Sequence, residues 1–332
     1  MKNKLLLSIA AVTLLTLGGE ALVNVNNEPQ VLAAKVHRKH HKKQRQAKKY
    51  RPHLLQKRPT YIIGQSTLPD AKSLIKNTGS LPIGTKFSWK KKPQINQPDS
   101  YSSGNAKIKV VYPDHSVDIV PVTFKLYGKN EIVIPTNYLL KDVIQADQTN
   151  KATKQLEQAT TDGMESNKFI ADSPSDDKEK VDFYHLTNDQ KKRLNNFAVK
   201  LINATRTAFG TPSVSTDDEV LSAADKVANR YKNDHYEYYQ GHDIEALDRI
   251  LLDRYGSFAE DMNAQEDKPK TMTDMKEFVY NSIRAYLFNN ISWEWHHAAS
   301  IIGVSEEAPG RLAVSYTRAP DDFYVTHFIF IP

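Results

Sequence analysis

Cysteine is absent from the 332 residues of this chain. Without cysteine there is no disulfide framework, so the folded parts must be stabilised by packed apolar cores. No cysteine nucleophile is available either, and no serine stands in the Gly-x-Ser-x-Gly setting of a nucleophile elbow. The zinc-protease motif His-Glu-x-x-His is also missing. These absences argue against the common cysteine, serine and zinc hydrolases.

Long apolar runs are scarce, and the longest lies near the amino terminus. It covers residues 5–17, which is shorter than the ~20 residues that a helix needs to span a bilayer. Two lysines precede it and small residues follow, so residues 1–34 are predicted to be a secretory signal rather than an uncleaved anchor. Cleavage after Ala34 would expose a basic arm directly, whereas cleavage at Ala21 fits the spacing to the apolar run better. Both positions stay open, and the chain is predicted to be secreted.

Acidic residues are absent from the stretch Lys35–Arg58, which carries eleven lysines and arginines. The formal net charge of the chain is +6 and residues 1–34 are neutral on balance, so the remainder from Pro59 carries −5. Residues 35–60 are therefore predicted to be a disordered basic arm. We expect this arm to attach the chain non-covalently to an anionic cell-wall polymer or a membrane surface. Nucleic acid is not an expected partner, because aromatic residues are not interleaved with the cations.

Residues 61–130 have the alternating pattern of β-strands. A hairpin is predicted between Lys107–Tyr112 and Val117–Leu126, joined by the turn Pro-Asp-His-Ser. The runs LPDAKSLIKN, LPIGTKFSWKKKP and YPDHSVDIVPVTFKL resemble a Rib/alpha-type repeat of Gram-positive surface proteins, which implies a small β-sandwich that acts as a spacer. That family has glycine after Tyr-Pro-Asp, where this chain has His115, so a positive φ is expected for a histidine here. Trp89 is interpreted as a core residue, with a glycan or receptor contact as the alternative.

Residues 131–185 are polar and rich in acids. The stretch Lys151–Thr160 could form a helix, whereas Asp172–Asp182 has the serine, proline and aspartate content of a linker. We therefore interpret the whole segment as a linker that contains one helix.

Four helices and three strands are predicted within residues 186–332. The helix starts and stops are marked by Thr187, Thr216, Asp243, Gly256 and Thr273. The strands are predicted at Ile301–Val304, Leu312–Tyr316 and Tyr324–Ile331. Helices followed by antiparallel strands indicate a layered α+β sandwich.

Imidazole and carboxylate side chains are gathered at three separated points of this C-terminal part. They are Gly241-His242-Asp243, Ala259-Glu260-Asp261 and Trp293-Glu294-Trp295-His296-His297. Such side chains bind divalent metals and transfer protons near neutral pH. Each group lies beside a helical segment, so folding could bring them into one cleft. We expect at most one of the two adjacent histidines to enter it easily.

The order of these motifs resembles the CAP superfamily of SCP-like domains. The run LINATRTAFG is similar to the first helix of that family, and AADKVANRYKND followed by GHD is similar to its second helix and first cleft histidine. The run AED is similar to the element that supplies its cleft glutamate, and WEWHHAASIIGV is similar to the segment that carries its second histidine. The runs LTNDQKKRLNNFAVKLINATR and TMTDMKEFVYNSIRAYLFNN also resemble the surface-exclusion (PgrA-type) proteins of Gram-positive bacteria. This resemblance implies a CAP-like α-β-α sandwich over residues 186–332.

The resemblance also implies a cleft built by His242, Glu260 and His297. The family's other glutamate has only a poor match in Glu277, and Glu294 is a substitute because it stands three residues before His297 on one face of a helix. The predicted metal ligands are therefore His242, Glu260, Glu294 and His297, with zinc as the candidate divalent ion. Taken singly, each residue has an ordinary structural explanation, such as a helix cap or a surface charge.

Three functions remain open at this stage. The first is a cell-surface binding module that acts in surface exclusion or cell-contact modulation through another surface protein or glycan, as the resemblance implies. The second is a metal-dependent hydrolase of a peptide or cell-wall substrate, with an ion on His242 and His297 and Glu260 as general base. The third is an adhesin for host glycan or matrix. The enzyme is less favoured, because the sequence contains no convincing nucleophile.

Overall fold

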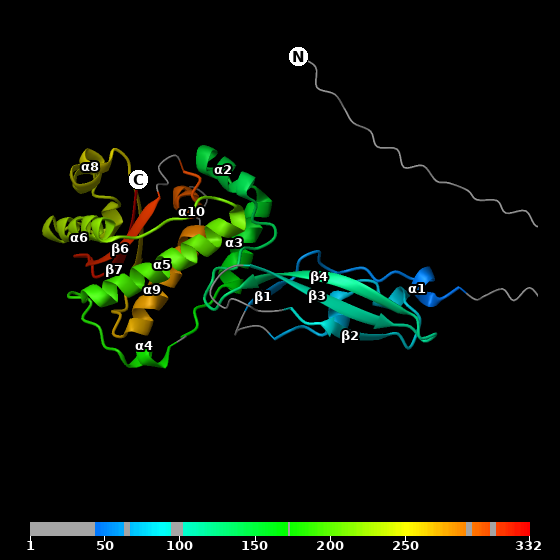
Figure 1. Cartoon of the computed structure of the whole chain (residues 1–332). Coiled ribbons are helices and arrows are strands. Elements are labelled where there is room, and N and C mark those ends of the chain that lie inside the picture. Colours follow the sequence, from blue (N-terminus) through cyan, green and yellow to red (C-terminus); the bar gives the residue numbers. More distant parts are fainter. Residues whose placement is uncertain (1–43, 63–66, 94–101, 172, 290–293, 306–309) are drawn as a thin grey trace, which may run out of the picture. The chain divides into compact units, whose positions relative to one another are not determined.

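The computed structural model describes residues 44–62, 67–93, 102–171, 173–289, 294–305 and 310–332 (Figure 1). The predicted signal at residues 1–34 and the first part of the predicted arm lie outside the described residues. None of the described helices combines the length and the apolar character needed to cross a membrane.

The first folded part is built on a four-stranded sheet in the order β1-β4-β3-β2. Its strands are β1 Thr60–Ile62, β2 Lys86–Lys91, β3 Ser102–Val111 and β4 Val117–Tyr127. Strand β1 is parallel to β4, and the other neighbours are antiparallel. The β3–β4 pairing confirms the predicted hairpin. His115 lies in its turn with φ 64°, the conformation for which glycine is the favoured residue.

One face of this sheet is buried and the other is exposed. The buried face carries Ile108, Val110, Val122 and Phe124. Two 3-10 turns, Ala71–Leu74 and Thr78–Ser80, lie over it. Ala71 of the first turn packs against this face, as do Ile75 and Leu81, the residues that directly follow the two turns. Trp89 is half-buried here. Its Nε1 donates to the carbonyl of Pro69 over 3.1 Å, and its ring packs on Phe124 at 6.0 Å between centroids, as expected for a core residue. The described strands of this part form one sheet, and short turns cover its buried face on the side where a second sheet was expected.

The later part of the predicted basic arm is folded rather than disordered. Residues 46–49 form helix α1 (Gln46–Lys49), and Ala47, Tyr50 and Leu54 pack against the sheet core. Backbone hydrogen bonds join His53 and Leu55 to the segment around Leu74. These three partly buried apolar side chains lie among lysines and arginines and pack the segment against the domain. The high charge of the segment had instead predicted disorder.

Residues 131–185 are also part of a core rather than a linker. They form α2 Leu140–Thr149, α3 Lys154–Ser166 and α4 Pro174–Lys178. Val143 and Ala146 of α2 and Leu156 and Ala159 of α3 are almost completely buried in the same core as the helices that follow. Helix α3 corresponds to the one helix that the sequence predicts in this segment.

The C-terminal part is an α-β-α sandwich around a three-stranded antiparallel sheet in the order β5-β7-β6. The strands are β5 Ala259–Gln265, β6 Arg311–Arg318 and β7 Tyr324–Ile331. The helices are α5 Asn188–Phe209, α6 Asp218–Asn233, α7 Ile244–Leu247, α8 Asp253–Tyr255, α9 Met272–Phe288 and α10 His296–Ile302, with a π-helical turn Asp248–Leu252 between α7 and α8 and a 3-10 turn at Tyr238–Gln240.

The two faces of this sheet have separate cores. Leu312 and Phe328 point to one face and pack with α5, α9 and α10. Ala313 and Ile329, the next residues along the same strands, point to the other face and pack with α6 and α7. Successive side chains of a strand thus stabilise opposite layers, which confirms the expected α+β sandwich.

Helix ends follow the predicted caps closely, and the strands less so. Thr187 makes the expected capping box on α5, and Gly256 ends α8 with φ 77°. The caps of α6 and α9 are Asp217 and Thr271, each close to the predicted residue. The strand predicted at 301–304 is wrong, because Ile301 and Ile302 belong to helix α10, and β5 was not predicted.

Candidate ligand-binding site

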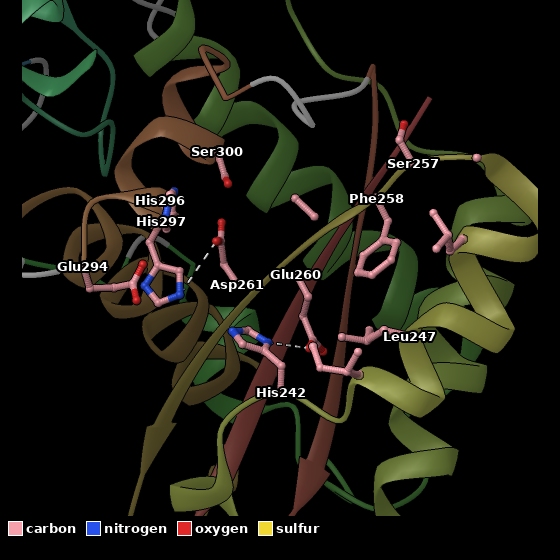
Figure 2. A pocket seen from close by; sticks show the side chains of 14 residues that line it. His242, Leu247, Ser257, Phe258, Glu260, Asp261, Glu294, His296, His297 and Ser300 are labelled. Atoms are coloured by element: carbon pink, nitrogen blue, oxygen red, sulfur yellow. Dashed lines mark hydrogen bonds and ion pairs between the residues drawn. The ribbon is translucent and has the colours of Figure 1, made fainter. Parts of the chain in front are cut away.

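The three groups of imidazoles and carboxylates meet at one cavity of about 530 Å³ (Figure 2). His242, Glu260, Glu294 and His297 all line it, together with Asp261, His296 and Ser300. The rest of the lining comes from Ile244, Leu247, Leu252, Gly256, Ser257, Phe258 and Ala259. The structure thus brings together every residue that the sequence analysis selected for the cleft.

The cavity lies at the edge of the sheet, because β5 is an edge strand. Ala259 packs with the α5–α9 core and Met262 with the α6–α7 core, so alternation places Asp261 on the first side and Glu260 on the second. Both carboxyl groups line the same cavity. The cavity therefore extends around the edge of the sheet and reaches both layers.

Glu260 is the centre of a buried hydrogen-bond network on the α6 side. Its side chain is 1% exposed and accepts from Tyr231 Oη over 2.6 Å, His242 Nδ1 over 2.8 Å and His327 Nδ1 over 2.8 Å. Tyr231 in turn accepts from the backbone N–H of Asp243 over 2.7 Å. This network joins α6, the start of α7, β5 and β7 through one carboxylate.

His327 has a fixed orientation in this network. Its Nδ1 bonds to the Glu260 carboxylate, which cannot donate while it is ionised, so Nδ1 carries a proton. Its Nε2 bonds to the Thr317 hydroxyl over 2.7 Å, and its ring packs on Tyr231 at 4.6 Å between centroids. The ring is completely buried, so His327 supports Glu260 from behind and does not line the cavity.

The network stabilises the ionised form of Glu260. Burial alone would raise its pKa, but the hydrogen bonds and charges of His242 and His327 outweigh burial and lower the pKa to about 2. For His242, burial acts to lower the pKa, whereas the bond to Glu260 and the charges of Glu260 and Glu294 raise it above its usual value. The buried Glu260 carboxylate thus holds the partly exposed His242 by a hydrogen bond, and His242 presents its ring to the cavity.

The opposite wall holds a second imidazole–carboxyl pair. His297 Nε2 lies 3.9 Å from Asp261 Oδ1, which is too long for a hydrogen bond. Burial, together with the charges of His242 and His296, lowers the pKa of His297 to about 4. Burial and the carboxylates of Glu294 and Glu260 raise the pKa of Asp261 well above its usual value. Near neutral pH the His297 ring is therefore uncharged.

Asp261 retains an unused acceptor. It is 2% exposed, and its Oδ2 has no hydrogen-bond partner among the described residues. Buried polar atoms in native proteins are nearly always paired with protein or water. A free oxygen on a cavity wall is therefore available to a ligand atom or a water.

The remaining predicted residues are held by helix α10 and the segment before it. His296 Nδ1 lies 2.6 Å from Asp147 Oδ1, the distance of an ion pair, so its imidazole is next to α2 although the residue contributes to the lining. Arg206 of α5 fixes the end of α10 by donating to the carbonyls of Ser300 over 2.9 Å and Ile301 over 3.0 Å. Glu294 lines the cavity just before the helix, and Glu277 is not part of the lining.

The residues do not fit the predicted zinc site. No three His, Asp or Glu side chains in the described part of the chain are placed to bind a common ion. Both oxygens of Glu260 already accept hydrogen bonds from protonated groups, and His242 uses Nδ1 for the same contact. A ligand role for Glu260 would require this network to break.

Three residues of the site, Tyr231, Ser300 and His327, are not marked by the sequence patterns that selected the others. Tyr231 fits the sequence only as an apolar position of its helix, and His327 only as a structural residue of the last strand. Asp261 belongs to the selected group Ala259-Glu260-Asp261 but has no predicted role. The signal that could identify His327 is a histidine among alternating apolar residues, which requires a buried polar partner.

Comparison with known proteins identifies both folded parts. Residues 46–127 match the family model of the Rib domain. The CAP domain of enterococcal PrgA superimposes with a TM-score of 0.50 at 19% identity, over 61% of this chain and 85% of that one. A Rib structure from Streptococcus pyogenes is 30% identical over 25% of this chain and all of that one, with a TM-score of 0.22. No curated protein matches the sequence.

At 19% identity the likeness to PrgA concerns the fold alone. The Rib match begins at residue 46, where α1 packs on the sheet, and ends with β4. Residues 46–127 of the chain belong to the Rib domain family, and the head that follows them has the fold of a CAP domain.

Proposed function

We propose that the chain is a binding protein of the cell surface, whose CAP-type head binds a partner at the cavity beside β5. Through this contact it acts in surface exclusion or in limiting contact between cells. The sequence resemblance to surface-exclusion proteins and the fold shared with the PrgA CAP domain support this role.

The observation that carries the proposal is that the Glu260 carboxylate is already hydrogen-bonded to three side chains of the protein. This carboxylate is also buried, and its pKa is lowered to about 2. A general base works best when its pKa is near the working pH, and its oxygen must reach the proton that it removes. Glu260 meets neither condition, so it supports the cavity wall, and the hydrolase is the weaker alternative.

The lining of the cavity suits a ligand with both apolar and polar groups. Leu247, Leu252 and Phe258 supply an apolar surface, whereas Asp261 and His297 supply polar groups on the opposite wall. Ligand sites commonly combine such an apolar surface with a few polar groups that fix orientation. A peptide segment or a glycan of a neighbouring surface molecule has this mixed character.

The test compares two variants of equal chemistry in a mating assay. Leu252 is 42% exposed and lines the cavity, and Ile170 is 41% exposed and does not line it. Leu252→Glu should weaken partner binding, because it places a charge on the apolar wall. Ile170→Glu is the matched control, and each variant is displayed on recipient cells in place of the original chain.

We expect plasmid transfer into recipients with Leu252→Glu to rise towards the level of recipients without the protein, and Ile170→Glu to keep transfer low. Equal transfer for all recipients would reject a role in exclusion. In that case, adhesion of the same cells to matrix-coated surfaces tests the adhesin alternative. Exclusion that persists with Leu252→Glu would show that the cavity is not the contact site.

A further inference from the structure

The exposed face of the Rib sheet carries cations on every long strand. Alternation along β2, β3 and β4 separates the buried residues from an outward set, and the register of the strands places that set in rows across the sheet. We call the five lysines of this outward set, together with the neighbouring arginine, the lysine face; it consists of Lys86, Lys91, Lys107, Lys109, Lys125 and Arg58.

Arg58 joins this face through β3. Its guanidinium donates to the Ser103 hydroxyl over 2.7 Å, and Ser103 is paired with Lys125 in the register of β3 and β4. From Ser103 to Lys109 the strand rises about 20 Å, at ~3.3 Å per residue. The cations therefore cover most of the length of the hairpin shown in Figure 1.

The face has no acidic residue to balance these charges among its described positions. The other outward side chains include Ser88, Ser103, Asn105, Val111, Val117, Ile119, Pro121 and Thr123. None of the six cations makes an ion pair within the described part of the chain. The lysine face is thus a region of concentrated positive charge within residues 46–127, which contain fourteen lysines and arginines and four acidic residues.

Like charges are adjacent on this face, which works against folding stability. Lys91 is directly opposite Lys107 in the β2–β3 register, and like charges at such positions destabilise a sheet. Arg58 is close enough to Lys125 to lower the pKa of that lysine, in addition to the larger effect of burial. A polyanion lying across the rows would relieve both repulsions.

We propose that the lysine face is a binding surface for a linear phosphodiester polymer of the cell surface. Its phosphates contact the lysine rows, and its polyol carbons lie against Val117 and Ile119, which are 42% and 38% exposed. Lysine binds phosphate as a point charge and needs no fixed orientation, which suits a repeating chain.

Two other polyanions fit the face less well. Single-stranded nucleic acid is usually bound by aromatic side chains that stack on its bases, and no exposed outward position described on β2, β3 or β4 is aromatic. Anionic membranes are usually bound together with large apolar side chains that enter the lipid, whereas the aliphatic side chains here are only partly exposed. The sheet face also differs from the basic arm at residues 35–43, which lies outside the described residues.

The experiment measures binding of the secreted chain to lipid-free poly(glycerol phosphate) as a function of salt. The test variant is Lys107→Gln/Lys109→Gln. The matched control is Lys72→Gln/Lys76→Gln, which removes the same charge from exposed positions at the turn that covers the opposite face of the same domain. A third variant, Lys42→Gln/Lys43→Gln, removes two charges from the basic arm.

We expect the test variant to bind about tenfold more weakly and to lower the slope of log K against log salt by about 1.4. The control should change both quantities much less, and thermal unfolding should show the test variant folded. Equal losses in test and control, a loss confined to the arm variant, or no binding to the polymer would each overturn the proposal. Tighter binding to phosphatidylglycerol vesicles or to an oligonucleotide of equal phosphate number would also overturn it, and would assign the face to a membrane or to nucleic acid.

Discussion

Replacing Glu260 by glutamine tests the network behind the cavity, because the side chain keeps its shape and loses its charge. The carboxylate accepts three hydrogen bonds, from Tyr231, His242 and His327. Hydrogen bonds to a charged group contribute roughly 1 kcal/mol more than neutral ones. Three such bonds predict that Glu260→Gln lowers the free energy of unfolding of the head by about 3 kcal/mol at pH 7.

The lowered pKa of Glu260 reflects the same contacts and adds their pH dependence. The pKa falls from 4.5 in the unfolded chain to about 2 in the folded head, and each unit corresponds to about 1.4 kcal/mol, which gives a similar value of about 3.5 kcal/mol. Because the folded pKa is the lower one, this stability is present above pH 4.5 and is lost as the pH falls towards 2. The difference between the original chain and Glu260→Gln should therefore shrink over that window.

Denaturant unfolding at a series of pH values measures both effects, with the Rib domain as an internal control. The transition of the head should move and that of the Rib domain should not. A loss below 1 kcal/mol at pH 7, or a difference that stays constant from pH 5 to pH 2, would refute the assignment of Glu260 as an ionised structural centre.

Three further predictions concern single residues. Gly163→Ala should destabilise the head by about 1–3 kcal/mol in the same unfolding assay, because the added Cβ would lie 2.4 Å from the Phe288 ring. An unchanged free energy of unfolding would contradict the close packing of α3 on α9. In an NMR titration the His297 imidazole should have a midpoint near pH 4, since burial and the charge of His242 disfavour its cationic form. A midpoint near 6.5 would show that the site is open to water. His115→Gly should stabilise the Rib domain by about 0.5–1 kcal/mol, because the turn holds this residue at φ 64°. A lower melting temperature of the variant would mean that the histidine side chain contributes a stabilising contact.

The parts of the fold that were predicted correctly carry their signal locally. Helix α5 has a capping box at Thr187 and apolar residues at helical spacing up to Gly210, so its limits can be read from its own residues. The β3–β4 hairpin has alternating strands on either side of a Pro-Asp turn. In both cases the sequence of one segment is sufficient.

The missed parts depend on contacts with distant residues. Strand β5 contains Glu260 and Asn263, and its polar side chains are accommodated because Tyr231 and Ser282 bond to them from two helices. The residues 296–302 form a helix although Ile301 favours strands, since Arg206 binds the free carbonyls at the end of that helix. A tertiary cap of this kind has no counterpart in the segment itself.

The candidate site was predicted in its membership and not in its chemistry. Spacing and family resemblance indicated that His242, Glu260 and His297 share one cleft, and they do. Whether Glu260 is free to act depends on His327, which is 67 residues away along the chain and comes next to it only when β7 pairs with β5. Pairing of strands decides this point, and sequence spacing does not.

The position of the cavity around the edge of β5 has a practical consequence for finding what it holds. A molecule seated there touches residues anchored in both layers of the sandwich, so its binding energy is added to the unfolding free energy of the head as a unit. At a concentration of one hundred times its dissociation constant, such a molecule would contribute about 2.7 kcal/mol. A thermal-shift screen of glycans and peptides can therefore report occupancy without a biological assay.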